Sequence, residues 1–383
     1  MAQGFDGNAA LKEQYKGWGD TSVMNEGVGI KEMDSTDVDI GFVQNRREGK
    51  VRGQRTLNLD LVTNDFANPS GGFQHQPRVM ELLPLFMSHY QMFEGVGTGN
   101  ASGTVGGTWR FAPANRTPDA TGTNWGTFSS DTDWGGAGNS NSNNCRDFYP
   151  LTLEVGYGTI EGANAVTQLI FKDGYVDSQE WTQSFDGDLM ISHSLLFKGT
   201  QANSTFMNGG ANFGSNTTPT TLRFAAWNAT LSIDGTANTT LDIEDWNLTT
   251  VNKGEGRGRI GAYGFGRYSF SDFEVSGGMR SEFKDFFLYQ KVLSGSVFDM
   301  TIRWDDAGGN EWIQLQMPNV RFRPVTPNIA GGDSNIEVDW EFEGFATTVG
   351  GQGTPAIYVS ANGTFGTHLL SFQEGTGGVD LTK

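Results

Sequence analysis

Apolar and polar residues alternate with a period of two along most of the patterned segments of this chain. A β-strand shows this period when one of its faces is buried, so these segments are predicted strands. Val176 and Trp181 are candidate core residues of one of them. The predicted strands cover residues 53–61, 108–111, 149–155, 166–171, 175–185, 188–199, 229–235, 241–251, 266–275, 297–304, 311–317, 319–323, 336–344, 356–359 and 368–372.

Two segments depart from this alternation, and both are predicted to be short helices. Residues 79–90 place apolar side chains such as Val79, Leu82 and Phe86 on one helical face. Pro84 lies within that segment, which predicts a kink or a split in the helix. Residues 281–292 form the second predicted helix. The chain therefore combines many short strands with very little helix.

The order of these elements occurs twice. The strand at 53–61, a Gly-containing stretch and the helix at 79–90 form a first copy, which closes on the strand at 188–199. The strand at 266–275, Gly277-Gly278 and the helix at 281–292 form a second copy, which closes on the strand at 336–344. The predicted fold is mainly β, with two tandem small β-barrel or sandwich domains, each with a flanking short α-helix.

Composition along the chain sets the predicted domain boundaries. Residues 1–45 are polar and Gly-rich and are predicted to be an N-terminal arm, followed by a first domain at 46–200. Residues 201–221 are rich in Asn, Gly, Ser and Thr and are the predicted linker to a second domain at 222–345. Residues 346–383 are a C-terminal extension, expected to dock on the body or on a neighbour.

Turns and loops add three expectations. Residues 297–304 and 311–317 are predicted to pair as a hairpin, because both arms alternate cleanly around a turn with adjacent glycines. Residues 229–235 are predicted to pair with 241–251 as a second hairpin. The loop at 114–144, rich in Gly, Ser, Asn and Asp, is long enough to be functional or mobile.

The overall charge limits the possible partners. The chain has 383 residues and a formal net charge of −18, with 44 acidic and 26 basic residues. Such a surface repels a DNA backbone and is not expected to hold nucleic acid by neutralising phosphates. Solubility is the simpler reason for the charge. The start of the chain shows no signal peptide, and no apolar run approaches the length of a membrane span.

The residues that could carry chemistry do not form a recognisable site. Cys145 is the single cysteine, so neither a disulfide nor a thiolate metal site can form within one chain. His75, His89, His193 and His368 are far apart in sequence and lack a metal-ligand spacing. His89 near the end of its helix is expected to favour the negative end of the helix dipole.

Acidic pairs and a glycine-rich stretch are also expected to be structural. Asp305 with Asp306, and Glu341 with Glu343, are carboxylate pairs, but alternation places the glutamates on the wet face of a strand. Asp305-Asp306 lacks the full ligand set of a known calcium loop. The glycine-rich residues 254–258 lack the strand–loop–helix context of a phosphate loop. We therefore predict no enzyme activity, no cofactor, and no catalytic, cofactor-binding or metal-ligating residues.

The second copy resembles the tail tube proteins of long-tailed, siphovirus-type bacteriophages, in a tandem-domain form. The resemblance lies in the order of residues 229–235, the Gly-Arg-x-x-Phe-Ser-x-Phe-x-Val pattern at 266–275, the helix, and the hairpin that carries Trp304 and Trp312. It continues through the strands at Val320 and Val338. Residues 151–156, the segment ending at Gly199 and residues 15–21 look like the matching parts of the first copy. The resemblance covers roughly residues 10–345.

This resemblance implies a structural virion protein that self-assembles into stacked rings and forms the hollow tail tube through which DNA is ejected. The implied partners are the chain itself, in a ring of three with pseudo-six-fold symmetry or a ring of six, and the adjacent rings. Tape measure and tail terminator or baseplate proteins are also implied, whereas DNA passes without specific binding and no membrane is involved. The hairpin around 305–311 and the 114–144 loop are the expected contacts between rings. The implied location is the phage tail, after synthesis in the host cytoplasm.

Two other readings remain open from the residues. One is a carbohydrate-binding or adhesive β-sandwich protein of a virion or cell surface. Exposed Trp and Tyr clusters in a groove would favour this interpretation. The other is a glycoside hydrolase, which needs a carboxylate pair in a cleft.

Overall fold

The structure is a computed structural model. It describes residues 8–13, 28–30, 39–41, 44–47, 63–66, 69–99, 105–113, 150–159, 166–203, 224–237, 241–258, 265–270, 272–283, 286–306, 308, 311–325, 336–349 and 352–366. The predicted strands at 53–61 and 368–372, the loop at 114–144, Cys145 and His368 lie wholly or mostly outside these residues. No helix in the described part of the chain is long and apolar enough to cross a membrane.

The fold is mainly β, as the alternation predicts. The helical elements are α1 (Val79–His89), the 3-10 turn η4 (Ala226–Asn228) and α3 (Phe287–Ser294). The strands are β1 (Asn8–Glu13), β2 (Val28–Ile30), β3 (Asp39–Gly41), β4 (Gln44–Arg47), β5 (Thr63–Phe66), β6 (Ser70–His75), β7 (Gln91–Gly99), β8 (Val105–Ala112), β9 (Leu151–Thr159), β10 (Val166–Gln183), β11 (Met190–Asn203), β12 (Ala229–Ile233), β13 (Thr236–Ala237), β14 (Ile243–Val251), β15 (Gly254–Gly258), β16 (Phe265–Phe270), β17 (Glu274–Glu282), β18 (Phe298–Asp305), β19 (Trp312–Phe322), β20 (Glu337–Gly344), β21 (Thr347–Val349), β22 (Gln352–Thr354) and β23 (Tyr358–Gly366).

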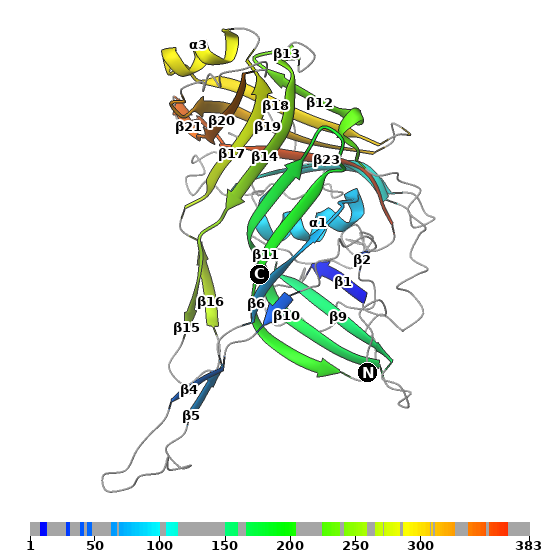
Figure 1. Cartoon of the computed structure of the whole chain (residues 1–383). Coiled ribbons are helices and arrows are strands. Elements are labelled where there is room, and N and C mark those ends of the chain that lie inside the picture. The colour runs from blue at the N-terminus through cyan, green and yellow to red at the C-terminus, as the bar shows by residue number, and fades with distance from the viewer. Residues whose placement is uncertain are drawn as a thin grey trace, which may run out of the picture.

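One long hairpin, β10–β11, belongs to both halves of the molecule (Figure 1). The first half of β10 pairs with β9, which pairs with β1, and β11 pairs with β6. From Ser178 onward β10 pairs with β14 instead. Asp173, at the end of the region paired with β9, has a left-handed φ of 53°, and the register with β11 shifts between Val176 and Ser178. These irregularities lie where the strand passes from one half to the other, as expected of bulges that redirect a strand.

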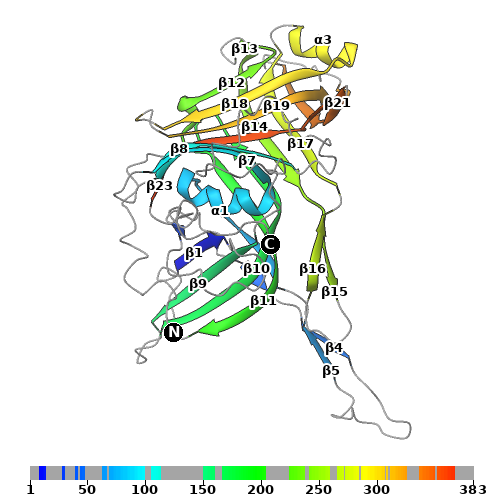
Figure 2. The same cartoon turned by 180° about the vertical axis from the view of Figure 1, so that it is seen from behind.

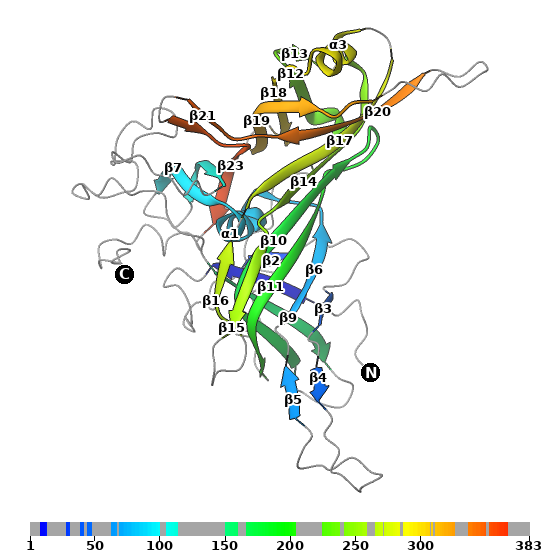
Figure 3. The ribbon, with the colours of Figure 1, turned by 90° about the vertical axis from the view of Figure 1, so that its left-hand side faces the viewer.

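The second half continues as an antiparallel sheet in the order β10, β14, β17, β20, β19, β18, β12. Figure 3 shows β11, β10, β14 and β17 running side by side. An isolated bridge between Asp188 and Ala225 joins the approach to β11 with the approach to β12, and it closes this circuit into a barrel. Elsewhere the ladders of the described residues form an open, branched antiparallel sheet.

The described part of the C-terminal extension is integral to the fold. β23 pairs with β19 on one side and with β8 on the other, and β8 pairs with β7. Ile357, Val359 and Ala361 of this segment are buried. The extension docks on the body, as one of the two expectations had it, and it connects strands that are far apart in sequence.

The helix α1 is enclosed by strands on two sides, whereas the prediction has a short helix that flanks its domain. It lies between β8–β23 on one side and β1–β9 on the other (Figures 1 and 2). Leu82, Met87 and Ser88 are almost completely buried, although their positions are spread around the helix axis. A helix that is buried all round needs a core on every side. Pro84 lies inside a single continuous helix, so the helix is not split.

Aromatic rings join the core around α1 to the core of the barrel. Phe86 of α1 stacks on Trp181 of β10, with ring centroids 5.8 Å apart. Trp181 stacks on Trp304 at 6.1 Å, and Trp304 contacts Trp246 at 5.6 Å. Trp181 and Val176 are fully buried, which confirms both as core residues. The two halves therefore share one hydrophobic core, to which buried residues of both contribute.

Several strand boundaries differ from the prediction. The segments at 166–171 and 175–185 are one strand, β10, and those at 311–317 and 319–323 are one strand, β19, which runs through Pro318. The predicted strand at 266–275 is divided between β16 and β17. Gly277 and Gly278 lie inside β17, and α3 begins only at Phe287. Each difference reflects tertiary pairing that extends or interrupts a local pattern.

One of the two predicted hairpins is present in the structure, and the other is not. β18 pairs with β19 around the turn near Asp306, as the alternation predicts. β12 does not pair with β14; it forms a tight hairpin with β13 and pairs with β18. Asp234 and Gly235 have left-handed φ values of 46° and 77° in that two-residue turn, the backbone of a type I′ hairpin.

Two ribbons project from the body in Figures 1 and 2. β15 pairs with β16, and β4 pairs with β5, each as a separate two-stranded sheet. The glycine-rich residues 254–258 are thus a strand, in agreement with the prediction that they do not form a phosphate loop. The β15–β16 ribbon continues the β14–β17 hairpin beyond the barrel.

Candidate channel wall and assembly surfaces

The outer face of β14, β17 and β20 is a polar wall. β20 alternates strictly, with Val338, Trp340 and Phe342 buried and acidic residues between them facing outward. Register places Asp245 of β14 opposite Arg280 of β17, and Arg280 opposite Asp339 of β20. The apolar face of the same strands belongs to the core, so this sheet separates a dry side from a wet side. The burial of Trp340 confirms the prediction that Glu341 and Glu343 lie on the wet face of their strand.

This wall is hollowed into a groove of about 570 Å³. Its floor includes Gly278, which leaves open the space that a side chain would fill between Asn247 and the β20 backbone. The neighbouring Gly277 faces the core, where an added Cβ would lie 2.4 Å from the Asn247 carbonyl oxygen and 2.5 Å from the Phe342 ring. The two glycines lie on opposite faces of β17, and the absence of their side chains lets β17 pack closely between β14 and β20. The groove is lined by Asp245, Asn247, Thr249, Ser276, Gly277, Gly278, Met279, Arg280, Arg323, Asp339, Trp340, Glu341 and Phe342.

Carboxylates hold both arginines of the groove. The Nε of Arg280 donates to Asp339 Oδ1 at 2.8 Å, and Asp245 Oδ2 lies 4.0 Å from its Nη1. Arg323 donates from Nε to Glu343 Oε1 at 2.9 Å and from Nη1 to Glu341 Oε2 at 3.1 Å. Hydrogen bonds to Asp339 and to Glu343, with the nearby negative charge, raise the pKa of Arg280 and Arg323 respectively. Four carboxylates thus face two guanidinium groups, and the groove is acidic overall.

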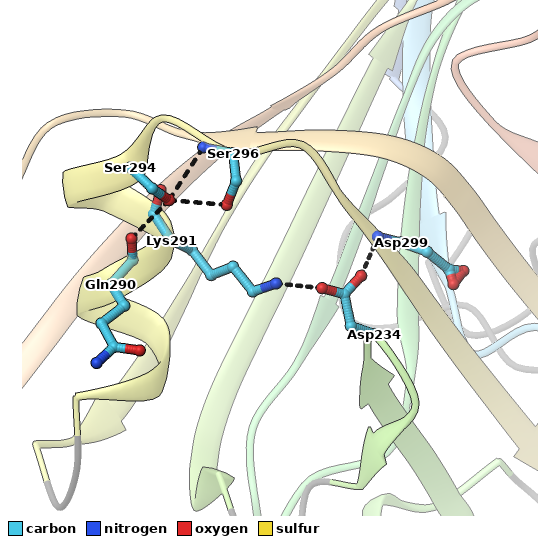
Figure 4. Close-up of polar contacts among 6 residues, drawn as sticks. All are labelled: Asp234, Gln290, Lys291, Ser294, Ser296 and Asp299. Atoms are coloured by element: carbon cyan, nitrogen blue, oxygen red, sulfur yellow. Dashed lines mark hydrogen bonds and ion pairs between the residues drawn. The ribbon is translucent and has the colours of Figure 1, made fainter.

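The helix α3 is tied to the barrel by an ion pair, shown in Figure 4. Lys291 of α3 donates to Asp234 in the β12–β13 turn, and the other oxygen of Asp234 accepts from the Asp299 backbone N–H at 3.0 Å. Burial opposes ionisation of Asp234, but the hydrogen bonds from Lys291 and Asp299 outweigh it and lower its pKa. Desolvation and the charge of Asp234 raise the pKa of Asp299.

The end of α3 is closed by serine contacts in the same view (Figure 4). Ser294 Oγ lies 2.7 Å from the Gln290 carbonyl oxygen and 2.9 Å from Ser296 Oγ. Gly295 then takes the left-handed conformation that commonly ends a helix. With the helix fixed in this way, Phe286 and Leu293, seven positions apart, are 62% and 69% exposed. The outer side of α3 is therefore a candidate assembly surface.

A second pair of exposed aromatic residues lies where the barrel closes. Phe185 is in the turn between β10 and β11, and Trp227 is in η4. The Ala226 N–H donates to the Gly187 carbonyl oxygen at 3.1 Å, which holds these two segments together. Both rings are largely exposed, so this end of the barrel is a second candidate assembly surface.

Two of the four histidines come together in the core, which the sequence reading missed. His75 Nε2 lies 3.0 Å from His193 Nε2, and His75 Nδ1 lies 3.3 Å from Glu81 Oε2. His75 and His193 are far apart in sequence, and they meet because β6 pairs with β11, with His193 opposite Phe73. The sequence did hold a sign of this burial, since His75 and His193 both alternate with apolar residues in their strands. In the described part of the chain, no group of three His, Cys, Asp or Glu residues could hold a metal ion.

His89 is neutral and buried, contrary to the expected interaction with the helix dipole. Its Nδ1 lies 3.0 Å from the Val176 carbonyl oxygen and its Nε2 lies 2.9 Å from Thr250 Oγ1. We assign the proton to Nδ1, which donates to Val176, so that Nε2 accepts from Thr250. Burial lowers the pKa of His89 to about 4, although the bond to Val176 opposes this shift. Burial and the neighbouring histidines also hold the pKa of His193 well below its usual range.

The acidic residues at the β18–β19 turn have structural partners. Asp305 Oδ1 accepts from Arg303 Nη2 at 2.7 Å. Asp306 is buried and accepts from the Glu311 backbone N–H at 3.1 Å, which closes the turn. Neither this pair nor the arginine-bound pair on β20 has the arrangement of an acid and a nucleophile across a cleft.

Comparison with known protein families decides what kind of protein carries these surfaces. The family model described as phage tail tube protein matches residues 91–344, which is more than half of the chain. The chain belongs to the phage tail tube protein family. No curated protein sequence matches it.

Membership of this family makes the chain a structural tail protein and a virion component, and it implies self-assembly into the tube. The resemblance seen in the order of residues 229–235, 266–275 and the Trp304/Trp312 hairpin is thereby confirmed. The match extends from β7 to the end of β20, so it takes in the whole polar wall and the α3 helix of this tail tube protein.

Proposed function

We propose that this tail tube protein assembles into stacked rings that form a hollow tail tube, and that DNA is ejected through this tube. The ring contains three copies with pseudo-six-fold symmetry or six copies. In the three-copy case, residues 46–200 and 222–345 act as the two tube-like domains, with 1–45 as an arm and 201–221 as the linker. Adjacent rings, tape measure and tail terminator or baseplate proteins are the further partners, and the chain is made in the host cytoplasm.

The observation that carries this proposal is the polar wall of β14, β17 and β20. A channel for DNA needs a surface that is wet, free of exposed apolar side chains and unable to neutralise many phosphates. The wall meets these needs, because the outward positions that line the groove are polar or glycine and its carboxylates outnumber its arginines. We therefore propose that this face lines the channel.

Unpaired strand edges supply a means of joining copies. In the described part of the chain, β2, β3, β7 and β13 each have one ladder partner, so each has a free edge. A free edge is a template for a strand of another chain, and closing a ring removes it. The turn at 305–311 and the loop at 114–144 are proposed to reach adjacent rings.

The groove offers little support for the adhesive alternative. The aromatic residues among those that line it, Trp340 and Phe342, turn their rings into the core and are at most 2% exposed. A sugar-binding groove would instead present such rings to its ligand.

The test is electron microscopy of the purified full-length chain, with light scattering to give the particle mass. Hollow rings or tubes support the proposal, and the ring mass distinguishes three copies from six. A cryo-electron microscopy map then shows which face lines the hole. Solid particles, or a hole lined by α3 with the polar wall outside, would contradict the proposal.

A further inference from the structure

The two arginines of the polar wall are each enclosed by carboxylates from neighbouring strands. Arg280 lies between Asp245 and Asp339 in one cross-strand row over β14, β17 and β20. Arg323 follows β19, and its backbone N–H donates to the Glu341 carbonyl oxygen at 2.9 Å. Its side chain then reaches the Glu341 and Glu343 carboxylates on the same face of β20. Each arginine therefore connects strands of the wall and is neutralised where it stands.

These arginines are nevertheless open to solvent. Their side chains are 46% and 54% exposed, so a phosphate group could reach them. Guanidinium groups bind phosphate through the same fork of N–H donors that they use for carboxylates. Arg323 already donates to two carboxylates. Arg280 donates to Asp339 and has a second carboxylate, that of Asp245, 4.0 Å away. Fewer donors are therefore left for a phosphate, and the surplus negative charge repels it.

We infer that Asp245, Asp339, Glu341 and Glu343 mask two latent phosphate-binding arginines, and that this masking keeps the wall from holding passing DNA. The inference rests on the proposed passage of DNA along this face. It assigns β20 a specific role, because this strand supplies three of the four masking carboxylates. The wall keeps the cross-strand stabilisation of its arginines without offering cations to a nucleic acid backbone.

The experiment observes each arginine directly in the full-length chain labelled with ¹⁵N-arginine. The Nε–H signals of Arg280 and Arg323 are assigned from Arg280→Lys and Arg323→Lys variants, and a short DNA duplex is then titrated in. In the E341Q/E343Q variant, only the Arg323 signal is expected to respond, with apparent affinity at least about tenfold higher than in the unsubstituted chain. In the D245N/D339N variant, only the Arg280 signal is expected to respond. Both responses should weaken as salt rises, because bound phosphates release counterions.

The matched control is E180Q/E244Q, which removes the same charge from two exposed residues of β10 and β14. These glutamates do not hold either arginine in the described part of the chain. No response is expected there. An equal response in the control would assign the effect to net charge and overturn the inference. A response of equal affinity in the unsubstituted chain, or silence in both masking variants, would also overturn it.

The two masking variants act on different arginines, so each serves as the internal reference for the other if one of them fails to fold. The assay measures the chain whether or not it forms rings. Absence of rings in the microscope would therefore count against the proposed function alone, whereas the titration would still decide the masking.

Discussion

Acid should destabilise this protein through His89, and the size of the effect follows from the structure. His89 is neutral in the folded chain, with Nδ1 donating to Val176 and Nε2 accepting from Thr250. The hydroxyl of Tyr90 lies 3.2 Å from Thr250 Oγ1, and Asn252 Nδ2 donates to the His89 carbonyl oxygen at 2.8 Å. A second proton on the imidazole would place an uncompensated charge in a site that excludes water.

The sign and the magnitude come from the two pKa values. The pKa of His89 falls from 6.5 in the unfolded chain to about 4 in the folded chain. As pH falls through this range, the unfolded chain takes up a proton that the folded chain refuses, so the free energy of unfolding decreases. The shift of about 2.5 units corresponds to a loss of about 3 kcal/mol, which is complete only below about pH 4. His193 contributes in the same direction.

The assay is urea unfolding followed by tryptophan fluorescence at a series of pH values, at a concentration where light scattering confirms monomer. The reference is His89→Asn, whose amide can still donate to Val176 but does not titrate. This variant should be less stable at neutral pH, yet between about pH 7 and pH 4 it should lose about 3 kcal/mol less than the unsubstituted chain. Titrating groups common to both chains cancel in this difference. If the two stability curves run parallel, His89 does not titrate as the structure implies.

Three further perturbations have matched controls. Gly277→Ala should lower the free energy of unfolding by about 1–3 kcal/mol, because the added Cβ would meet a carbonyl oxygen and a packed ring. The Cβ of Gly278→Ala would point into the groove and should lower this free energy much less, and urea unfolding of both variants measures the difference. Asp234→Ala should lower the free energy of unfolding by about 1–2 kcal/mol and loosen α3, whereas Asp234→Asn should retain the turn and the bond to the Asp299 N–H. Hydrogen exchange of the α3 amides distinguishes the two variants, and equal protection of α3 in both would refute the role of the aspartate. A chain ending at Val349 lacks β23 and should fail to fold, because the loss of the buried residues and two ladders of β23 outweighs a total stability of about 5–15 kcal/mol. A chain ending at Gly366 should fold. Circular dichroism and solubility measure the outcome, and a folded chain ending at Val349 would contradict the integral role of β23.

Local pattern predicted the parts of the fold whose partners are close in sequence. The β18–β19 hairpin, the alternation of β20 and the short α1 helix all follow from the spacing of apolar residues. Trp181 and Val176 were correctly predicted to be core residues. In each case the residue's own neighbours carry the information, because burial of one face sets the period.

Long-range pairing could not be predicted in this way. Nothing in the sequence near Ile243 indicates that β14 pairs with β10 and β17 and not with β12. The enclosure of α1 depends on β23, which lies more than 250 residues later and was read as part of an extension. The arginine clasps were missed for the same reason, since Arg280 and Asp245 meet only once the strands are in register.

The shared hairpin β10–β11 has a mechanical consequence. Most joints between structural units are flexible segments or side-chain contacts, which yield when one unit is twisted against the other. Here the joint is backbone, since β10 passes from β9 to β14 without leaving its ladder with β11. Bending the molecule at this point would load a row of hydrogen bonds together, and the stacked rings of Phe86, Trp181 and Trp304 brace the same place from inside. The two halves are therefore expected to move as one stiff body.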